Sequence, residues 1–314
     1  MAEASAATRP TAGRPATGRP PHGDAFAAGA MTLPAAAGLV AFVGIPFVLA
    51  IGMSLTNLRL GSPLPVEWIG LEQYRRLLED PTFRRALFNN AYFAAVIVPV
   101  QTGLALAGAV VVNARLPGRT WVRAALFIPV VFPMAMVAVA WELLYAPGPG
   151  GALNSWLDAL TLGLWEPRDW LRDPVLAMPS LMALSVWQGM GLQMVILLAG
   201  LQSIPASLYE SARLDGAGAW SRFRHVTLPQ LRNPLVFVVV ITAILAFRVF
   251  DQVQILTRGG PGDATTTIMY EAITAAFTRQ QVALASAMSV VFFVAVLGIT
   301  WLGRRAFRQE GDTA

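Results

Sequence analysis

Long uncharged apolar stretches alternate with short polar segments along most of the chain. A transmembrane helix needs about 20 mostly apolar residues to cross the bilayer core, and a charge near its centre is costly. Five stretches contain no charged residue and have about this length, between Asp24 and Arg59, Arg85 and Arg115, Arg123 and Glu142, Asp173 and Glu210, and Arg279 and Arg304. A sixth, residues 233–256, has the apolar length of a span but contains Arg248 and Asp251. The pattern predicts an all-α membrane protein with six transmembrane helices.

The predicted spans divide the chain into one transmembrane domain and two tails. The spans are residues 30–55, 88–112, 122–145, 175–201, 233–256 and 281–303. Residues 1–29 are mostly Ala, Pro, Gly, Thr and Arg, and we expect a disordered tail there because they have little apolar surface to bury. The transmembrane domain is residues 30–303, and residues 304–314 form a C-terminal tail. Apolar residues at helical spacing in residues 268–277 also predict a short amphipathic helix along the outer surface.

The distribution of arginine predicts the orientation of these helices. With the N-terminus inside, thirteen arginines lie in inner segments and nine in outer ones. Cytoplasmic segments carry the excess of basic residues in membrane proteins, so both tails are predicted to be cytoplasmic. The polar segment between the fourth and fifth spans is then cytoplasmic as well.

Composition excludes several kinds of chemistry. All 23 basic residues are arginine, so the chain lacks the lysine of a P-loop and cannot hydrolyse ATP in that way. It has no cysteine and only two histidines, which excludes Cys-ligated metals and a His-rich metal site. The net charge of +5 is spread between apolar stretches rather than clustered, so nucleic-acid binding is not expected.

The polar segment of residues 203–234 predicts two short helices joined by a turn. Gly216 suits the left-handed residue that ends a helix, and Gly218 frees the chain before a second helix begins at Ala219. Leu228-Pro229 is expected to end that second helix, because proline disfavours helical geometry in the preceding residue. Held between two spans, such a hairpin would form a compact projection on the inner face.

The order of residues in this hairpin resembles a known motif. Glu210-Ser211-Ala212 is followed by Asp215-Gly216-Ala217, then by Phe223 and by Leu228-Pro229. This order and spacing closely resemble the EAA coupling loop of ABC importer permeases, with Ser211 in place of the middle alanine. Residues 69–74, 198–205 and 250–262 are similar to the carbohydrate-uptake branch of that family. The resemblance extends from about the first predicted span to the last.

The resemblance implies a six-span type I importer permease in a bacterial inner (plasma) membrane. A separate cytoplasmic ATPase dimer would bind ATP and Mg, and would act on the coupling loop of residues 203–232; this chain itself would carry no cofactor and no metal. A homologous second permease would complete the path, and an extracytoplasmic solute-binding protein would deliver a sugar or sugar derivative. The coupling residues implied are Glu210, Ala212, Asp215, Gly216, Ala217, Phe223, Leu228 and Pro229. The plainer interpretation of these residues is an amphipathic inner loop with solvated charges.

Polar residues within the spans are candidates for the substrate path. Sugars form hydrogen bonds through their hydroxyls and stack their C–H faces on aromatic rings, so glutamine or glutamate beside tryptophan suits them. The candidates are Trp141, Glu142, Trp187, Gln188, Gln193, Arg248 and Asp251. Alternatively, these side chains satisfy one another between helices, Glu142 is solvated at the outer end of its span, and Arg248 and Asp251 neutralise each other along one helix.

Gly259-Gly260-Pro261-Gly262 predicts a turn on the outer side. The same four residues are candidates for docking the solute-binding protein. Both interpretations are compatible with the sequence.

Other functions remain as alternatives. An importer of the same class could carry glycerol-3-phosphate, glycerophosphodiesters or polyols. An ion-coupled secondary transporter would need carboxylates within its spans, where only Glu142 and Asp251 occur, and often has inverted repeats, which are not visible here. A membrane-embedded enzyme would need a paired carboxylate, metal or nucleophile cluster, which the spans lack.

Overall fold

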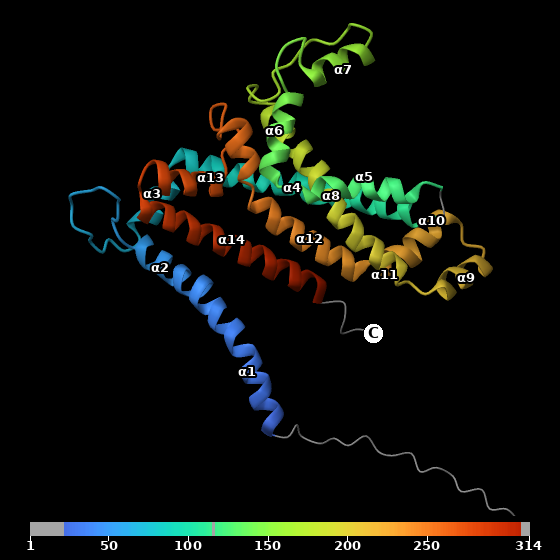
Figure 1. Cartoon of the computed structure of the whole chain (residues 1–314), viewed down its shortest axis with the longest axis horizontal. Coiled ribbons are helices and arrows are strands. Elements are labelled where there is room, and N and C mark those ends of the chain that lie inside the picture. Colours follow the sequence, from blue (N-terminus) through green and yellow to red (C-terminus); the bar gives the residue numbers. More distant parts are fainter. Residues whose placement is uncertain (1–21, 115–116, 309–314) are drawn as a thin grey trace, which may run out of the picture. The chain divides into compact units, whose positions relative to one another are not determined.

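The computed structural model describes residues 22–114 and 117–308, and these residues are helical wherever they form regular structure (Figure 1). A single isolated β-bridge joins Thr56 and Trp68 within the described part. The predicted all-α class is therefore confirmed. Residues 1–21 of the predicted N-terminal tail and 309–314 of the C-terminal tail lie outside the described residues.

The chain divides into two compact units, residues 1–49 and 50–314. Helix α1 (His22–Leu39) and the π-turn η1 (Val40–Gly44) belong to the first, and α2 (Ile45–Ser54) continues into the second. Helix α1 begins before the predicted start of the span at residue 30. Residues 29–54 together are long and apolar enough to cross a membrane.

The second unit contains the remaining helices. Three of them are unbroken candidate spans: α4 (Pro81–Asn113), α8 (Ala177–Gln202) and α14 (Val282–Arg308). The others are α3 (Glu72–Glu79), α5 (Arg119–Val131), α6 (Met134–Leu144), α7 (Ala152–Leu160), α9 (Ala206–Leu214), α10 (Ala219–Arg222), η2 (Phe223–Thr227), α11 (Leu228–Gln230), α12 (Arg232–Phe247), η3 (Val253–Thr257), α13 (Ile268–Ile273) and η4 (Thr274–Thr278). With the first unit's helix, four unbroken spans are found in the described part, and six if each of two bent helix pairs counts as one.

The predicted third span is not one continuous helix. The helix axis bends by 105° between α5 and α6. Phe132 between them is extended, with ψ 139°, because the residue before a proline disfavours helical geometry and Pro133 follows it. The prediction of an unbroken helix over residues 122–145 was therefore wrong in this detail.

The predicted fifth span is also shorter than expected. Helix α12 ends at Phe247, and Arg248 lies in its C-terminal cap. Regular structure resumes with a short helical turn at Asp251 that leads into η3. The two charged residues of the stretch thus lie at a helix break rather than inside a helix.

Helix α8 lies against α4, α5 and α12 and forms the centre of the second unit (Figure 1). Glycines allow α8 to approach α4 and α5 closely. A Cβ at Gly191 would collide with the carbonyl oxygen of Leu126 on α5, and a Cβ at Gly108 of α4 would lie 3.3 Å from the sulfur of Met194. Small residues are common where membrane helices pack closely, because dispersion forces there require short interhelical distances.

Helix α13 and η4 pack one face into the core of the second unit. Ile268, Ala272 and Ala275 belong to a core cluster with Leu77 of α3, Phe83 of α4 and Met288 of α14. In residues 268–277 the predicted helix is confirmed, and one side of it packs against α3, α4 and α14. Phe277 and Thr278, at the end of η4, are exposed.

Candidate functional site

The segment between α8 and α12 forms a helical hairpin, residues 203–231. Helix α9 ends at Leu214, and Gly216 just beyond it has φ 78°, a backbone conformation that favours glycine. The Gly216 N–H donates to the Arg213 carbonyl (3.0 Å) and the Ala217 N–H to the Ala212 carbonyl (2.9 Å). These two bonds are those of a Schellman C-cap, so the predicted turn at Gly216 is confirmed. The second helix begins at Ala219, directly after Gly218, as predicted.

Side chains brace this hairpin internally. Arg222 Nη1 donates to the Ala217 carbonyl (2.8 Å), and the Tyr209 and Thr227 hydroxyls are 2.9 Å apart, which ties α9 to η2. The rings of Trp220 and Phe223 stack with centroids 5.6 Å apart. The sequence did not single out Tyr209 or Thr227, because these contacts depend on how the two helices pack.

The second helix of the hairpin does not end at Leu228-Pro229. It continues through α11 to Gln230, so the predicted stop was wrong. The π-turn η2 immediately before Pro229 closes with a bond from the Leu228 N–H to the Phe223 carbonyl. Because this turn has already changed the hydrogen-bond register, a proline without an N–H can be accommodated in the helix.

The hairpin exposes both charged and apolar side chains. Glu210, Arg213 and Asp215 are exposed, and neither acid forms an ion pair within the part of the chain described here. Leu214 is 89% exposed and Trp220 is 71% exposed. Large apolar side chains that project from a braced hairpin are typical of a surface that contacts another protein.

A second candidate site is a cavity of ≈ 290 Å³ near the middle of the second unit. Helices α4, α8 and α12 and the segment after α12 surround it. Its polar lining consists of Gln101, Ser185, Gln188, Gln193, Thr242, Arg248, Asp251 and Gln252. Four of the predicted substrate-path residues, Gln188, Gln193, Arg248 and Asp251, are thus brought together. Gln101, Ser185, Thr242 and Gln252 were not predicted, since single polar residues in apolar helices carry no signal that they share a cavity.

Gln193 joins two of the helices that line the cavity. Its side chain is only 3% exposed, and its Nε2 donates to Thr242 Oγ1 on α12 (2.6 Å). Thr242 in turn donates to the Val238 carbonyl (2.6 Å). The Oε1 atom of Gln193 has no hydrogen-bond partner among the described residues. An unpaired buried amide oxygen is costly, and because this atom is itself buried, a hydroxyl or water can reach it only after the surrounding side chains move.

Two other glutamines of the cavity, Gln188 and Gln252, bond to residues at breaks in the helices. Gln188 Nε2 donates to the Phe132 carbonyl (3.1 Å), which lies at the bend between α5 and α6. Gln252 Nε2 donates to Ser185 Oγ (3.0 Å) and so ties the segment after α12 to α8. Gln188 and Gln252 therefore stabilise the packing of the helices and also line the cavity.

Arg248 and Asp251 both line the cavity and are exposed. Because α12 ends at Phe247, they do not lie three residues apart on one helix face as expected. Within the described residues no ion pair joins them. Both charged side chains can therefore interact with a ligand in the cavity.

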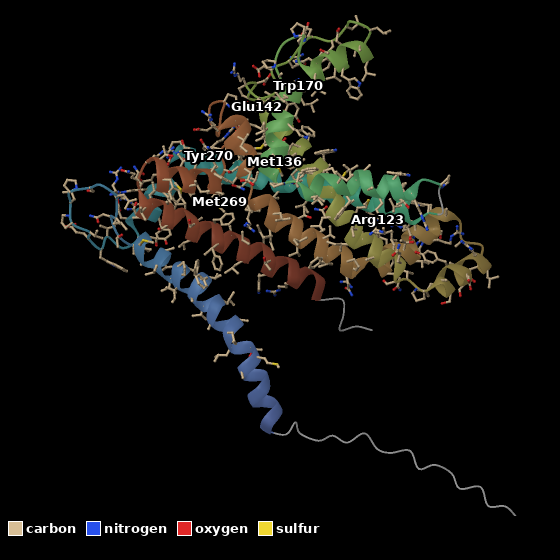
Figure 2. The ribbon with its side chains drawn as sticks, viewed as in Figure 1. Arg123, Met136, Glu142, Trp170, Met269 and Tyr270 are labelled. Atoms are coloured by element: carbon tan, nitrogen blue, oxygen red, sulfur yellow. The ribbon has the colours of Figure 1, made fainter. Side chains whose placement is uncertain are left out.

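Trp141, Glu142 and Trp187 do not line this cavity. Trp187 borders a separate apolar hollow between α4 and α8, and its ring lies 5.6 Å from that of Trp141. The ring contacts continue from Trp141 to Tyr145 (5.3 Å) and then to Trp170 (6.3 Å). Glu142 is exposed on α6, and Figure 2 shows it on the same side of the unit as Trp170. These residues thus connect α6 and α8 to the region around α7.

The loop that contains Gly259-Gly260-Pro261-Gly262 is held firmly by α4. Gly259 and Gly262 have φ 82° and 52°, as the predicted turn requires. Asn89 Nδ2 on α4 donates to the carbonyls of Asp263 and Thr266, both at 2.9 Å. Gly259 is buried against the Tyr270 ring, whereas Gly262 is exposed. The turn is confirmed, and its exposed part is the end at Gly262.

Within the described residues, no group of three or more histidine, cysteine or acidic side chains could hold a metal ion. The candidate sites therefore offer hydrogen bonds, two opposite charges and a protein-contact surface.

Comparison with known proteins agrees with this geometry. Residues 102–308 match the family described as "Binding-protein-dependent transport system inner membrane component". The chain is 37% identical over 245 residues to the trehalose/maltose transport system permease protein MalF of Thermococcus litoralis, covering 78% of this chain and 81% of that protein. It is 33% identical over 268 residues to the diacetylchitobiose uptake system permease protein NgcF of Streptomyces coelicolor, covering 82% and 75%.

The fold is similar to that of a chain in the crystal structure of a bacterial alginate ABC transporter in complex with an alginate pentasaccharide-bound periplasmic protein. The TM-score is 0.78 at 21% sequence identity, and the match covers 91% of this chain and 96% of that one. At this identity, the likeness concerns the fold alone.

Proposed function

The chain belongs to the family of inner membrane components of binding-protein-dependent transport systems, and from this premise we propose that it forms, with a second permease, the path for a sugar or sugar derivative. It is the permease component of an ABC importer and not the ATPase. The absence of lysine from the whole sequence is consistent with ATP and Mg binding on a separate subunit.

This proposal rests mainly on the connection between the hairpin and the cavity. The hairpin joins α8 to α12, and both helices also line the polar cavity. The bond from Gln193 to Thr242 links the same two helices at the level of the cavity. We expect an ATPase dimer bound to the exposed Leu214 and Trp220 to move the hairpin when it closes, and α8 and α12 with it. Such motion would open and close the cavity, as alternating access requires.

The substrate class is supported by the lining of the cavity. Its amides and hydroxyls, on Gln101, Gln193 and Thr242 among others, suit a neutral substrate with many hydroxyl groups. The cavity of ≈ 290 Å³ is at the lower end of the size range of small-molecule sites, which fits one half of a path completed by a second chain. The names of two relatives that cover most of the chain mention trehalose or maltose and diacetylchitobiose.

A phosphorylated substrate is the second candidate, because Arg248 lines the cavity. Asp251 lies on the same lining and would repel a phosphate group. The pair of opposite charges therefore favours a neutral sugar over glycerol-3-phosphate.

We further propose that the solute-binding protein docks at the loop of residues 259–262 on the outer side. The exposed Gly262 and Asp263 would provide the contact. The bonds from Asn89 keep this loop in a fixed position on α4, which suits a docking surface.

Uptake into proteoliposomes tests the proposal. The complex is reconstituted with its ATPase, second permease and binding protein, and ATP is enclosed on the ATPase side. We expect uptake of a labelled disaccharide or oligosaccharide that requires both ATP and the binding protein, with little competition from glycerol-3-phosphate. Uptake driven by an ion gradient without ATP would contradict the importer mechanism, and strong competition by glycerol-3-phosphate would contradict the substrate class.

A further inference from the structure

A pocket of ≈ 630 Å³, which we call the α3 pocket, lies in the second unit away from the polar cavity. It is formed by the segment between α2 and α3, by α3 itself and by the start of α14. Its polar lining includes Asn57, Arg59, Gln73, Arg76, Asp80 and Gln281. The α3 pocket shares no lining residue with the polar cavity, so it is a separate site.

Hydrogen bonds hold the walls of the α3 pocket in place. The Ala283 N–H donates to the Leu58 carbonyl (3.0 Å), which ties the segment after α2 to the start of α14. Within that segment, Asn57 Nδ2 donates to the Pro65 carbonyl (3.3 Å) and Asn57 Oδ1 accepts from the Glu67 N–H (2.8 Å). Because both ends of this amide are used, the segment has a defined shape and the pocket is preformed.

Arg59 is a charge of the lining that has no partner in the described part of the chain. It is exposed and forms neither an ion pair nor a side-chain hydrogen bond there. By contrast, Arg76 pairs with Glu72 (3.3 Å), and Asp80 Oδ1 accepts from the Thr82 N–H at the start of α4, where the helix dipole favours a carboxylate. An anionic group in the pocket would meet the guanidinium of Arg59, which can donate two parallel hydrogen bonds to a carboxylate.

Gln73 adds a hydrogen-bond acceptor to the lining. Its side chain is only 5% exposed, and its Nε2 donates to the Thr56 carbonyl (2.9 Å). Its Oε1 accepts no hydrogen bond within the residues that the structure describes. This oxygen favours an incoming N–H or O–H, because an unpaired buried acceptor is costly. The pocket therefore suits a peptide segment that brings both a carboxylate and main-chain N–H groups.

We propose that the α3 pocket receives an acidic side chain of the solute-binding protein, with the carboxylate on Arg59 and a main-chain N–H on Gln73. This inference rests on the proposed function, which places this end of the protein outside. The pocket adjoins the loop of residues 259–262, because Thr82 Oγ1, two residues beyond the pocket, donates to Asp263 Oδ2 (3.1 Å). The two sites would therefore contact the same docked protein.

The surroundings of Arg59 favour a protein over a lipid. A phospholipid would need an aliphatic surface that continues from the cation along a spanning helix. On the helices, however, the lining presents the amides of Gln73 and Gln281 beside Leu284, and its exposed aliphatic side chains belong to residues 60–66 of the loop. An arginine next to exposed apolar side chains is typical of a protein interface.

Binding of the importer's sugar-loaded solute-binding protein to the whole complex in nanodiscs tests this inference. We expect Arg59→Gln to raise the Kd about fivefold, as for a well-formed ion pair at a protein surface, and to reduce the dependence of the Kd on salt. Arg59→Lys should retain part of the affinity, because it keeps the charge but not the bidentate geometry. Arg75→Gln is the matched control, since Arg75 lies outside the pocket and already pairs with Glu72 and Glu79. It should leave the Kd unchanged.

Photocrosslinking identifies what occupies the α3 pocket. A photoreactive amino acid in place of Leu64, which lines the pocket and is 71% exposed, should crosslink to the solute-binding protein. Equal Kd values for Arg59→Gln and Arg75→Gln, or a crosslink only to lipid or to the second permease, would overturn the inference. ATP-dependent sugar uptake by the wild-type complex is measured separately. If uptake occurs and these results fail, only this inference is lost, whereas absence of uptake would contradict the proposed function itself.

Discussion

Gln193 is the residue that most directly links packing to substrate binding. Its nitrogen bridges α8 and α12 through Thr242, while its oxygen has no hydrogen-bond partner among the described residues. The amide nitrogen thus holds the two helices together, and we propose that the buried oxygen accepts a hydrogen bond from a substrate hydroxyl when the helices around the cavity move apart. A purely structural glutamine would be expected to have both ends satisfied.

Gln193→Ala should therefore impair sugar uptake. The loss of one hydrogen bond is worth about 0.5–1.5 kcal/mol, so we expect the half-saturating sugar concentration to rise about twofold to twelvefold. The measurement is sugar-dependent uptake in proteoliposomes at equal amounts of complex. Gln254→Ala is the matched control, because Gln254 is exposed and does not line the cavity. Unchanged uptake by Gln193→Ala would remove this residue from the path.

At the residue scale, the sequence predicted local geometry better than shared cavities. The left-handed turn at Gly216 could be predicted because only glycine adopts that conformation without strain. Gln188, Gln193, Arg248 and Asp251 were recognised as unusual within apolar stretches. Gln101 and Gln252 were missed, because their relation to the cavity depends on how α4 and α8 cross and on where α12 ends. Trp187 was placed near the glutamines by sequence adjacency, but its side chain faces another hollow.

At the element scale, the helices are less regular than their apolar lengths suggest. Proline and charge decide where the predicted spans break: Pro133 separates α5 from α6, and Arg248 lies at the end of α12. The sequence indicated the charges in the fifth span, but the extent of the bend between α5 and α6 depends on packing against α8. The buried position of α13 was likewise not predictable, since its apolar face is compatible with both a membrane surface and a protein core.

The close contact of α8 with α5 predicts a sharp difference between two glycines. Gly191→Ala should destabilise the protein by about 1–3 kcal/mol, because the new Cβ would collide with the Leu126 carbonyl oxygen, part of the backbone. Gly103→Ala on α4 is the control, since nothing lies within 4 Å of a Cβ at that position. Thermal unfolding of the purified chain in detergent should show a lower Tm for Gly191→Ala only. An equal Tm for both variants would contradict the close packing of α5 and α8.

At the scale of the whole molecule, the hairpin and the outer loop lie at opposite ends of the helices of the second unit (Figure 1). Helices α8 and α12 extend from the hairpin to the polar cavity, and α4 extends from the cavity to the loop of residues 259–262. The proposed function thus assigns separate regions of the protein to an ATPase, a substrate and a binding protein. The order of residues from Glu210 to Pro229 was sufficient to predict the hairpin, because the motif is local in sequence, and its contact with an ATPase stays a prediction.

The coupling role of the hairpin is the central claim, and the ATPase activity of the reconstituted complex tests it most directly. Gly216→Pro removes the N–H that bonds to Arg213 and is incompatible with φ 78°, whereas Gly218→Ala changes a glycine with ordinary φ and open space around it. We expect both variants to insert and assemble. ATPase activity stimulated by the sugar-loaded binding protein should fall to the basal level in Gly216→Pro and stay at the wild-type level in Gly218→Ala. Full stimulation of an assembled Gly216→Pro complex would contradict the claim that this hairpin transmits ATP hydrolysis to the substrate path.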